Sequence, residues 1–327
     1  MSSLRPVSGT ADEIRALLTE WEDAGDPEPI VIETSGSTGR PKKVVLSRAA
    51  MRASADATHA RLGGAGSWEL NLPPTYVAGV QVLFRTIRAG EHASRRYVSL
   101  VPTQLVRALK SDQRVDEIRE LDAVLVGGGP LDPRVRSRAE RRGIRVVQTY
   151  GMSETCGGCV YDGVPLDGVD VRIDDDEQVL LRGPVLFDGY DGEPERTAAA
   201  FRDGWLLTND LGHWAEDGRL RVDGRIDDVI ISGGVKVPAQ AVADVISRDL
   251  HGTPVYVVGV DDEEWGERVV AVVKVVGQRS LVSLDHLREL VTPREWVPKQ
   301  LVLVPEIPLL PNGKPDREAI RKLAADA

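Results

Sequence analysis

The sequence predicts an α/β protein, with a large N-terminal layered α/β domain that carries a β-rich subdomain and a small α+β C-terminal domain on a hinge. Up to residue 148, short apolar runs alternate with stretches of helical periodicity, which is typical of layers around a largely parallel sheet. From residue 160 the runs shorten and turns separate them, which indicates β-structure. A charged segment then precedes a second alternation of strands and helices. The predicted parts are an N-terminal domain at 1–224, a junction at 225–228 and a C-terminal domain at 229–327.

The N-terminal elements follow from apolar spacing and from residues that start or stop an element. Apolar side chains recur at helical spacing from Ile14 to Trp21, so a helix is expected over 11–23. Ser47 is a good helix N-cap, and Pro102 stops the strand before it. The remaining elements expected in this half are strands at 29–32 and 44–46, a helix at 47–61, a strand at 70–72, a helix at 76–87, a strand at 98–101, a helix from 103, a strand at 123–126, a helix at 133–142 and a strand at 145–148.

The second half of the chain is read by the same criteria. Short strands with turns between them are expected at 169–173, 178–181, 205–208 and 219–222. Beyond the hinge, the pattern predicts strand 229–231, helix 238–249, strands 255–260 and 268–275, helix 284–291, strand 301–304 and a C-terminal helix.

Composition excludes several classes of function. The 327 residues carry a net charge of −10 and a pI near 5.2, which argues against binding to nucleic acid or to an anionic membrane through bulk electrostatics. No apolar run approaches the ~18 residues of a membrane span, and the N-terminus lacks a charged-then-apolar leader. We therefore expect a cytoplasmic protein.

The two cysteines, Cys156 and Cys159, have the spacing of a redox pair or of half a zinc site. The five histidines are scattered, so a second pair of zinc ligands is not visible in the sequence. A redox pair would be expected to open a helix after a strand, whereas this pair follows a polar stretch. We favour small packing residues.

A polar loop between two apolar runs, Glu33 to Lys43, is the strongest single indication of function. Its glycines let the backbone approach a ligand, and its hydroxyls and lysines supply donors and positive charge for a polyphosphate. It is not the common P-loop, because Arg40 and Pro41 separate the second glycine from the lysine. The alternative is a Ser/Gly-rich hairpin with solvated lysines.

Two more polar stretches follow buried strands, at 127–130 and 149–155. In open α/β sheets, ligands bind beyond the carboxyl ends of the strands, so these stretches and 34–43 are expected to converge. Glu154 could hold a Mg²⁺ ion, which typically takes one or two carboxylates and several waters. Taken alone, Glu154 would be an ordinary surface carboxylate.

Five ordered signatures resemble those of the adenylate-forming superfamily, which includes acyl-CoA synthetases, peptide-synthetase adenylation domains and luciferases. They are the phosphate-loop segment 34–42, the segment Tyr150 to Thr155, the ribose segment 206–212, the hinge 224–228 with 231–234, and Pro311-Asn312-Gly313-Lys314. The resemblance therefore covers nearly the whole chain. It implies a two-step ligation in which a carboxylate attacks the α-phosphate of ATP and CoA then displaces AMP, with Mg²⁺ required.

The resemblance also implies the roles of individual residues. Lys314, Lys42 and Glu154 would be catalytic, and Glu154 would hold the metal. Gly127 to Pro130 would line the adenine, Tyr150 would stack on it, and Asp210 would take the ribose hydroxyls. The implied ATP-binding residues are Ser35, Gly36, Ser37, Thr38, Gly39, Lys42, Gly128, Gly129, Pro130, Tyr150, Gly151, Ser153, Asp210 and Arg225.

In the family the C-terminal domain rotates between the two half-reactions. Asp227 would be the hinge residue, and the rotation would first present Lys314 and then the segment 231–236. Gly233, Gly234 and Lys236 would bind CoA, because absent side chains leave room for a thin linear ligand.

The acid is suggested by the segments Ser99 to Leu105 and Thr149 to Cys156, which are similar to stretches of o-succinylbenzoate-CoA ligases of menaquinone (vitamin K2) biosynthesis. The implied partners are thus a small carboxylic acid, ATP and CoA, with no nucleic acid.

Compared with the family, the region before the phosphate loop is shortened, which a homodimer could compensate. Tyr76 stands where the family often has His, and Asn209 where it has Gly. Tyr76, Thr103, Gly157 and Gly158 are the predicted acyl-binding residues, and Arg85, Arg88, Thr103 or the backbone of Gly157 and Gly158 are the candidates for a second carboxylate.

Two rival interpretations stay open. One is another ligase that activates a different aryl or acyl acid or loads a carrier protein. The other is a non-catalytic nucleotide-binding protein on the same fold, against which the retention of Lys314 and Glu154 speaks.

Overall fold

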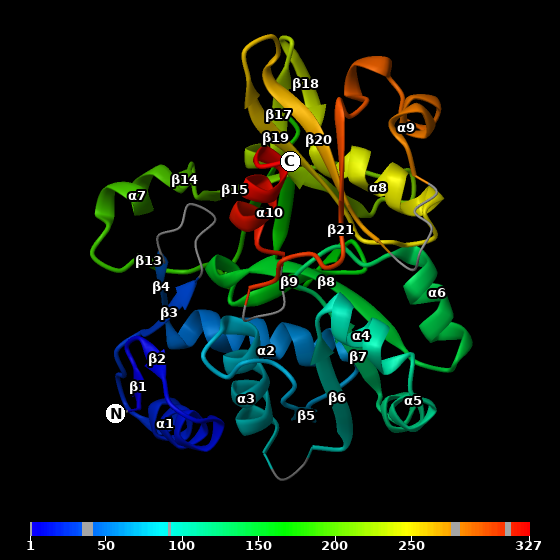
Figure 1. The fold of residues 1–327 in the computed structure, drawn as a ribbon. Helices are drawn as coiled ribbons and strands as arrows, with labels where there is room; N and C mark the ends of the chain where they lie inside the picture. The colour runs from blue at the N-terminus through cyan, green and yellow to red at the C-terminus, as the bar shows by residue number, and fades with distance from the viewer. Residues whose placement is uncertain (1, 35–41, 91–92, 276–281, 311–314) are drawn as a thin grey trace. The chain divides into compact units, whose positions relative to one another are not determined.

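The computed structural model describes residues 2–34, 42–90, 93–275, 282–310 and 315–327 (Figure 1). The chain forms two compact units. The first comprises Met1–Arg172, Leu180–Thr208 and Glu216–Leu220, and the second comprises Ile173–Val179, Asn209–Ala215 and Arg221–Ala327. Among the helices of the described residues, none is both long and apolar enough to cross a membrane.

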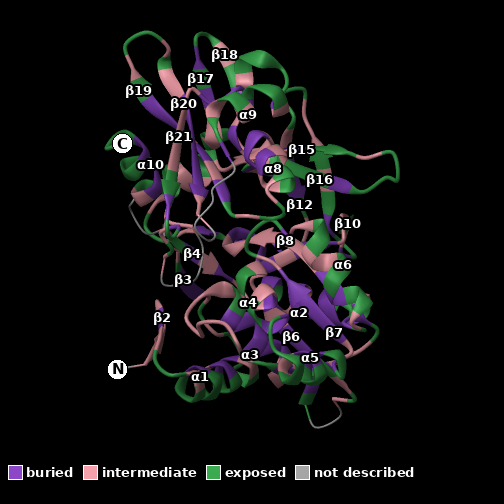
Figure 2. Ribbon diagram, turned by 45° about the vertical axis from the view of Figure 1, so that its right-hand side comes forward, coloured by how far each residue is buried: buried purple, intermediate pink, exposed green. Residues whose placement is uncertain are grey.

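A six-stranded sheet with the order β10-β9-β8-β7-β6-β5 forms the centre of the first unit (Figure 1). Strands β5 to β8 pair in parallel, as predicted, and β9 and β10 extend the sheet in antiparallel fashion. Figure 2 shows that β7 is buried along its length, which explains its uninterrupted apolar sequence. The strands are β5 (Gly66–Glu69), β6 (Arg95–Leu100), β7 (Ala123–Val126), β8 (Val146–Met152), β9 (Gly157–Tyr161) and β10 (Val164–Pro165).

Helices pack on this sheet and close its core. Leu105, Ile118 and Ala139, one from each of α4, α5 and α6, share a hydrophobic core with residues of β6, β7 and β8. Helix α3 packs against β5, and α1 and α2 pack against α3. The helices are α1 (Ala11–Asp23), α2 (Arg48–Leu62), α3 (Val77–Ala89), α4 (Pro102–Ala108), α5 (Asp112–Arg119) and α6 (Pro133–Arg141).

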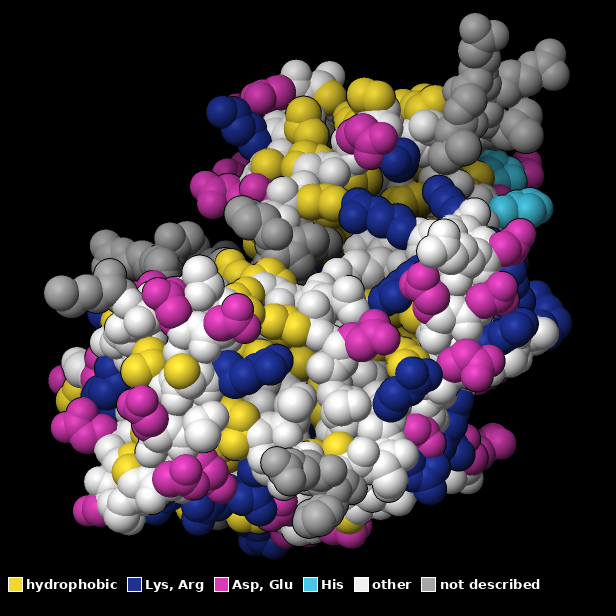
Figure 3. Space-filling view, turned by 90° about the horizontal axis from the view of Figure 1, so that it is seen from below, with side chains coloured by type: hydrophobic (Ala, Val, Ile, Leu, Met, Phe, Trp, Pro, Cys, Tyr) yellow, Lys and Arg dark blue, Asp and Glu magenta, His cyan; other side chains and the backbone are white. Residues whose placement is uncertain are grey.

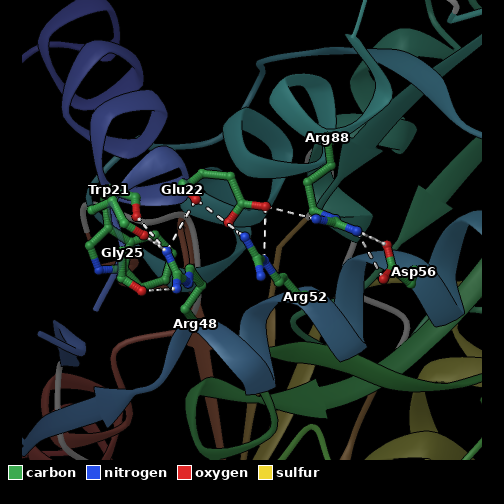
Figure 4. A network of polar contacts seen from close by, with 8 residues as sticks. Trp21, Glu22, Gly25, Arg48, Arg52, Asp56 and Arg88 are labelled. Carbon is green, nitrogen blue, oxygen red and sulfur yellow. Dashed lines mark hydrogen bonds and ion pairs between the residues drawn. The ribbon is translucent and has the colours of Figure 1, made fainter. Parts of the chain in front are cut away.

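A charged network ties α1, α2 and α3 together (Figure 4). The Glu22 carboxylate accepts hydrogen bonds from Arg52 Nε at 2.9 Å and from Arg88 at 2.7 Å, and Arg88 also binds Asp56 at 2.8 Å. Arg48 donates to backbone carbonyls at the C-terminal end of α1. Because the Glu22 side chain is only 11% exposed, its pairs with Arg52 and Arg88 are partly shielded from water and help to hold the three helices together.

The predicted strand–loop–strand unit around the phosphate loop is a hairpin. Strands β3 (Ile30–Thr34) and β4 (Lys42–Leu46) pair antiparallel, with Thr34 opposite Lys42. The short strand β13 (Gly189–Tyr190) pairs with the other side of β4, so these strands form a separate three-stranded sheet. The N-terminal strands β1 (Ser3–Leu4) and β2 (Val7–Ser8), which are close together in the sequence, pair with each other.

The β-rich part is a five-stranded sheet with the order β11-β12-β15-β14, and β16 pairs with β15. A short helix, α7, precedes β14. The elements are β11 (Asp170–Ile173), β12 (Gln178–Arg182), α7 (Pro194–Ala199), β14 (Phe201–Arg202), β15 (Trp205–Trp214) and β16 (Leu220–Arg225).

The second unit contains another five-stranded sheet, with the order β18-β17-β20-β19 and β21 parallel to β20. Its strands carry two hydrophobic cores, one shared with α8 and α9 and one shared with α10. The elements are β17 (Val229–Ser232), β18 (Val235–Pro238), α8 (Ala239–Asp249), β19 (Val255–Asp262), β20 (Gly266–Lys274), α9 (Leu284–Leu290), β21 (Gln300–Val304) and α10 (Arg317–Ala325).

Most predicted elements are confirmed within a few residues, but two predictions are wrong. The strand expected at 70–72 lies earlier, at Gly66–Glu69, where it pairs with β6, and the chain leaves the sheet before the two prolines. The stretch 149–155, expected to be a loop, continues β8 as far as Met152, because β9 folds back and pairs with it. The sequence pattern does not predict helices α5 and α7 or the strands β1, β2, β9, β10, β13, β14 and β18.

The surface agrees with the acidic, mixed-charge composition. On the face shown in Figure 3, acidic and basic side chains are interspersed rather than separated into large fields of one sign. Many of the arginines pair with neighbouring carboxylates, such as Arg114 with Glu117 and Arg136 with Glu140. Such pairs contribute little to stability individually.

Candidate active site

Two side chains from distant parts of the first unit, Lys42 and Tyr190, meet at Glu154. The ammonium Nζ of Lys42 lies 3.8 Å from Glu154 Oε1, and the Tyr190 hydroxyl donates to the same oxygen at 2.9 Å. Lys42 Nζ also lies 5.6 Å from the centre of the Tyr190 ring. The side chains of Lys42 and Glu154 are 25% and 12% exposed, so the pair is partly shielded and still open to a ligand.

The backbone explains why these residues meet. Lys42 begins β4, and Tyr190 of β13 pairs with Val44 of β4. This pairing brings the tyrosine alongside Lys42. Glu154 lies in a short 3₁₀ turn after β8, and its carbonyl accepts a hydrogen bond from the Phe187 backbone at 2.9 Å. The predicted convergence of Lys42 and Glu154 is therefore confirmed, although they come from two different sheets.

Tyr190 is a residue of this cluster that the sequence did not indicate. Burial and the neighbouring negative charge of Glu154 raise the pKa of its phenol, so it stays protonated and acts as a hydrogen-bond donor at neutral pH. The guanidinium of Arg196 lies 4.9 Å from the centre of its ring. The only sequence clue was an aromatic residue after Gly189, too common a pattern to single out.

The Glu154 carboxylate is suited to Mg²⁺ bound jointly with a phosphate ligand. In the described part of the chain, no group of three or more His, Cys, Asp or Glu side chains could hold a metal alone. Mg²⁺ in nucleotide sites typically uses one or two carboxylates and completes its shell with phosphate oxygens and water. A single, nearly buried carboxylate beside a lysine fits that arrangement.

The predicted adenine segment lies where β7 ends. A Cβ on Gly127 would lie 2.2 Å from Thr149 Oγ1, so the close approach of this segment to β8 requires glycine. Gly128 adopts a left-handed conformation with φ of 78°. Gly129 and Pro130 are exposed. The segments 127–130 and 149–152 are thus neighbours, as expected.

Strands β8 and β9 approach unusually closely at the predicted site. A Cβ on Gly151 would lie 2.0 Å from the Gly157 carbonyl oxygen, at a point where the register shifts between Tyr150 and Gly151. Tyr150 and Ser153 are both partly exposed along this stretch. The close backbone contact leaves no room for a side chain at Gly151.

Both cysteines are free and fully buried. Burial raises the pKa of the Cys159 thiol to about 12 and that of Cys156 further. They are therefore neutral packing residues at physiological pH, in line with the interpretation favoured from the sequence.

One face of α3 carries buried polar groups that lack partners. Gln81 and Arg85 lie one helical turn apart and are 1% and 4% exposed. Among the described residues, neither Gln81 Oε1 nor Arg85 Nε has a hydrogen-bond partner, and no carboxylate pairs with Arg85. The Arg85 guanidinium lies 5.1 Å from the centre of the Trp68 ring, whose own Nε1 is buried without a partner. His59 Nε2 is a fourth such atom, and burial together with the positive charge of Arg85 lowers the pKa of His59 to about 4.

This face is close to the predicted acyl-binding glycines. A Cβ on Gly157 would lie 3.7 Å from Gln81 Cγ, and Gly158 packs against Tyr161 and Thr149. Tyr76 lies at the N-terminal end of α3. Thr103 is exposed at the start of α4.

Arg88, the other arginine candidate, has a different environment. It is engaged by both Glu22 and Asp56 in the network of Figure 4. A guanidinium that already pairs with two carboxylates is neutralised by them. The structure therefore removes Arg88 from the candidates for binding the second carboxylate of the substrate.

The remaining nucleotide residues predicted from the sequence belong to the second unit. Asp210 lies in β15, and Arg225 ends β16. Asp227 accepts hydrogen bonds from Asn209 at 2.6 Å and from Arg225 at 3.3 Å. The predicted hinge residue is thus held by its own neighbours within this unit.

The predicted CoA residues lie in a single hairpin. Gly233 and Gly234 form the two-residue turn between β17 and β18, with φ of 58° and 78°, a backbone that favours glycine at both positions. The Gly233 N–H also donates to the Trp265 carbonyl at 2.8 Å. Lys236 is exposed on β18 opposite Ile231.

Several predicted site residues lie outside the described residues, so their roles stay predictions. They are Ser35, Gly36, Ser37, Thr38, Gly39 and Lys314.

Comparison with known proteins identifies the family. Residues 19–191 match the model of the AMP-binding enzyme family, and residues 242–314 match that of the AMP-binding enzyme C-terminal domain. A "Probable 2-succinylbenzoate–CoA ligase" of Mycobacterium tuberculosis (strain ATCC 25618 / H37Rv) is 39% identical over 97% of this chain and 90% of its own. The 2-succinylbenzoate–CoA ligase of Listeria monocytogenes serotype 4b (strain F2365) is 30% identical over 98% and 75%. An indoleacetate–CoA ligase of Aromatoleum aromaticum is also 30% identical, over 92% of this chain and 68% of its own.

Solved structures show the same architecture. The amide bond synthetase McbA from Marinactinospora thermotolerans superposes with a TM-score of 0.78 at 29% identity, covering 89% of this chain and 68% of its own. E. coli MenE with a bound analogue of OSB-AMS has a TM-score of 0.70 at 28% identity, with the same coverage. From its matched domains and its close relatives, this chain belongs to the family of AMP-binding, adenylate-forming enzymes.

Proposed function

We propose that this protein is an ATP-dependent acid–CoA ligase that converts 2-succinylbenzoate (o-succinylbenzoate) to its CoA thioester, a step of menaquinone biosynthesis. In the first half-reaction an oxygen of the acid attacks the α-phosphorus of ATP, and the bond to the β-phosphate oxygen breaks. The products are an acyl-adenylate and pyrophosphate. In the second, the CoA thiol gives up its proton, its sulfur attacks the acyl carbon, and AMP leaves.

The residues around Glu154 suit the first half-reaction. Phosphoryl chemistry of this kind depends on positioning and on neutralising charge more than on acid–base groups. Lys42 supplies a compact positive charge for the phosphates, next to the Glu154 carboxylate. Mg²⁺ held by Glu154 would offset the charge of the phosphate oxygens. Tyr190 donates a hydrogen bond to Glu154 and so orients it.

The other roles are carried over from the family resemblance. Ser35 to Gly39 would bind the β- and γ-phosphates, Asp210 the ribose, and Lys314 the reacting carboxylate and α-phosphate. Rotation at Asp227 would replace Lys314 with the hairpin around Gly233 for thioester formation. The division at 1–224, 225–228 and 229–327 belongs to the same proposal, as does a homodimer.

The single observation that favours a dicarboxylic acid is Arg85. A guanidinium that is 4% exposed, with no carboxylate partner among the described residues, is costly unless a ligand supplies the anion. It shares its helix face with Gln81, next to the predicted acyl residue Gly157. We therefore assign the ring carboxylate of 2-succinylbenzoate to Arg85. The flat Trp68 ring, which stacks on the guanidinium, would keep its donors pointed toward the ligand.

A second candidate is an aryl monocarboxylate, because a relative of similar identity is named an indoleacetate–CoA ligase. That substrate would leave Arg85 without an anion. The arginine therefore favours the first candidate.

The test is pyrophosphate release from ATP with a panel of acids, each with and without CoA. We expect 2-succinylbenzoate to give the highest kcat/KM, and CoA thioester to accumulate only when CoA is present. A preference for indoleacetate would support the second candidate. Turnover only with a carrier protein would indicate a carrier-loading enzyme, and ATP binding without any pyrophosphate release would indicate a non-catalytic nucleotide-binding protein.

A further inference from the structure

We propose that Tyr190 is a positioning residue for nucleotide binding: its hydroxyl holds the Glu154 carboxylate and its ring supports the Lys42 ammonium. This inference rests on the proposed function, because it assumes that Glu154 and Lys42 receive Mg²⁺ and the triphosphate. It assigns a role in that site to a residue outside every motif that the sequence indicated.

The geometry gives Tyr190 two separate contacts. Its hydroxyl donates to Glu154 Oε1 at 2.9 Å, the distance of a well-formed hydrogen bond to a carboxylate. Its ring centre lies 5.6 Å from Lys42 Nζ, within the range of a cation–π contact. The same carboxylate oxygen lies 3.8 Å from Lys42 Nζ, so the three groups form one cluster.

Tyr190 can act as a positioning residue because its own backbone is fixed. It pairs with Val44 in the strand that begins at Lys42. Its N–H donates to Thr197 Oγ1 at 2.8 Å, and Thr197 in turn packs so close to Gly189 that a Cβ there would lie 2.7 Å from it. The Phe187 ring packs edge-on against the tyrosine at 4.9 Å. A rigid donor therefore faces a carboxylate on a short turn.

The hydroxyl and the ring of Tyr190 are expected to have separate roles when a charged ligand binds. Mg²⁺ and a triphosphate would bring opposite charges to Glu154 and Lys42 and so weaken the attraction between those two side chains. The hydrogen bond from Tyr190 to Oε1 would orient the carboxylate and leave it able to hold a metal. The ring offers Lys42 a favourable surface that does not compete with phosphate.

Two substitutions separate these contacts. Tyr190→Phe keeps the ring and removes the hydroxyl, whereas Tyr190→Leu removes both. The measurement is calorimetric titration of the full chain with ATP, without acid or CoA, at a series of MgCl₂ concentrations and in EDTA. Thermal unfolding of each variant is followed alongside it.

We expect Tyr190→Phe to raise the Mg²⁺ concentration for half-maximal effect about tenfold, as for loss of a hydrogen bond to a charged group, and to leave the Kd for metal-free ATP unchanged. Tyr190→Leu should in addition weaken metal-free ATP binding by about three- to fivefold. If Tyr190 acts through Glu154, then Tyr190→Phe should add no further effect on the Mg²⁺ dependence in a Glu154→Gln background.

Tyr161→Phe is the matched control. It also removes a buried tyrosine hydroxyl, one that contacts Thr58 Oγ1 at 2.9 Å rather than Glu154. It should lower the unfolding temperature without moving the Mg²⁺ dependence. An unchanged Mg²⁺ dependence in Tyr190→Phe, or an equal shift in Tyr161→Phe, would overturn the inference. A wild-type chain that binds no ATP in Mg²⁺ would instead refute the proposed function.

Discussion

Replacing Arg85 with methionine should make the protein more stable and less able to use a dicarboxylic acid. The substitution keeps a long, unbranched side chain on α3 and removes a guanidinium that is 4% exposed and has no carboxylate partner among the described residues. Stability and substrate recognition are therefore expected to change in opposite directions.

The stability gain can be bounded from the contacts. Exchanging a buried, poorly compensated charge for an apolar side chain is often stabilising by about 1–4 kcal/mol. The contact of the guanidinium with the Trp68 ring at 5.1 Å would be lost, at a cost of about 1 kcal/mol. The net gain should be about 0–3 kcal/mol, which corresponds to about 2–4 °C in Tm for each kcal/mol in a unit of this size.

The loss in recognition follows from the charge-assisted contact to the ligand. Removing it should cost about 3 kcal/mol in transition-state binding, or about 150-fold in kcat/KM for 2-succinylbenzoate. An analogue that lacks the ring carboxylate, 4-oxo-4-phenylbutanoate, cannot use Arg85. Its kcat/KM should change less than about threefold, since only local packing is altered.

Arg88→Met is the control on the same helix. Arg88 is paired with Glu22 and Asp56, so its removal should destabilise the protein by about 1–3 kcal/mol and leave the ratio of the two substrates unchanged. The assays are urea unfolding and pyrophosphate release with both acids. If Arg85→Met is less stable than wild type and loses activity equally with both acids, then Arg85 is a structural residue and the assignment of the second carboxylate is refuted.

Three further predictions concern other residues. Lys314→Ala should nearly abolish adenylation but spare thioester formation from supplied acyl-adenylate; equal losses in both half-reactions would contradict the rotating C-terminal domain. Burial lowers the pKa of His59 from 6.5 to about 4 in the folded protein, so between these pH values the unfolded chain binds more protons and stability falls as the pH drops from 6.5 to 4. The variant His59→Gln should flatten this decline, measured as the urea midpoint of unfolding at each pH. An unchanged slope would exclude His59 as the source of the decline. Gly151→Ala places a Cβ 2.0 Å from a carbonyl oxygen and should destabilise the protein by about 2–3 kcal/mol. The control Gly25→Ala, whose Cβ would have nothing within 4 Å, should change the stability by less than about 1 kcal/mol. Similar losses of stability in both variants would refute the close β8–β9 contact.

Local sequence patterns predicted the elements whose residues carry their own signal. The fully apolar strand 123–126 and the helix beginning after Tyr76 are found almost as expected, because burial and helical spacing can be read within a dozen residues. Lys42 and Glu154 were also predicted as site residues, from motifs that resemble a known family.

Residues whose role depends on distant partners could not be predicted. Tyr190 reaches Glu154 only because a two-residue strand pairs with β4, more than a hundred residues away in the chain. Arg85 and Arg88 look equivalent in the sequence, and only the positions of Glu22 and Asp56 on other helices distinguish them. The pairing of residues 149–152 with β9 is not evident in the sequence, because polar residues and glycine hide it.

The buried thiols of Cys156 and Cys159 make this chain convenient for spectroscopic labelling. With the pKa of both raised by burial, almost no thiolate is present at neutral pH, and maleimide dyes should leave the native protein unmodified. Cysteines introduced at exposed positions such as Ser137 on α6 and Glu289 on α9 would then be the reactive ones. Energy transfer between two dyes could follow the proposed domain rotation without first replacing either natural cysteine.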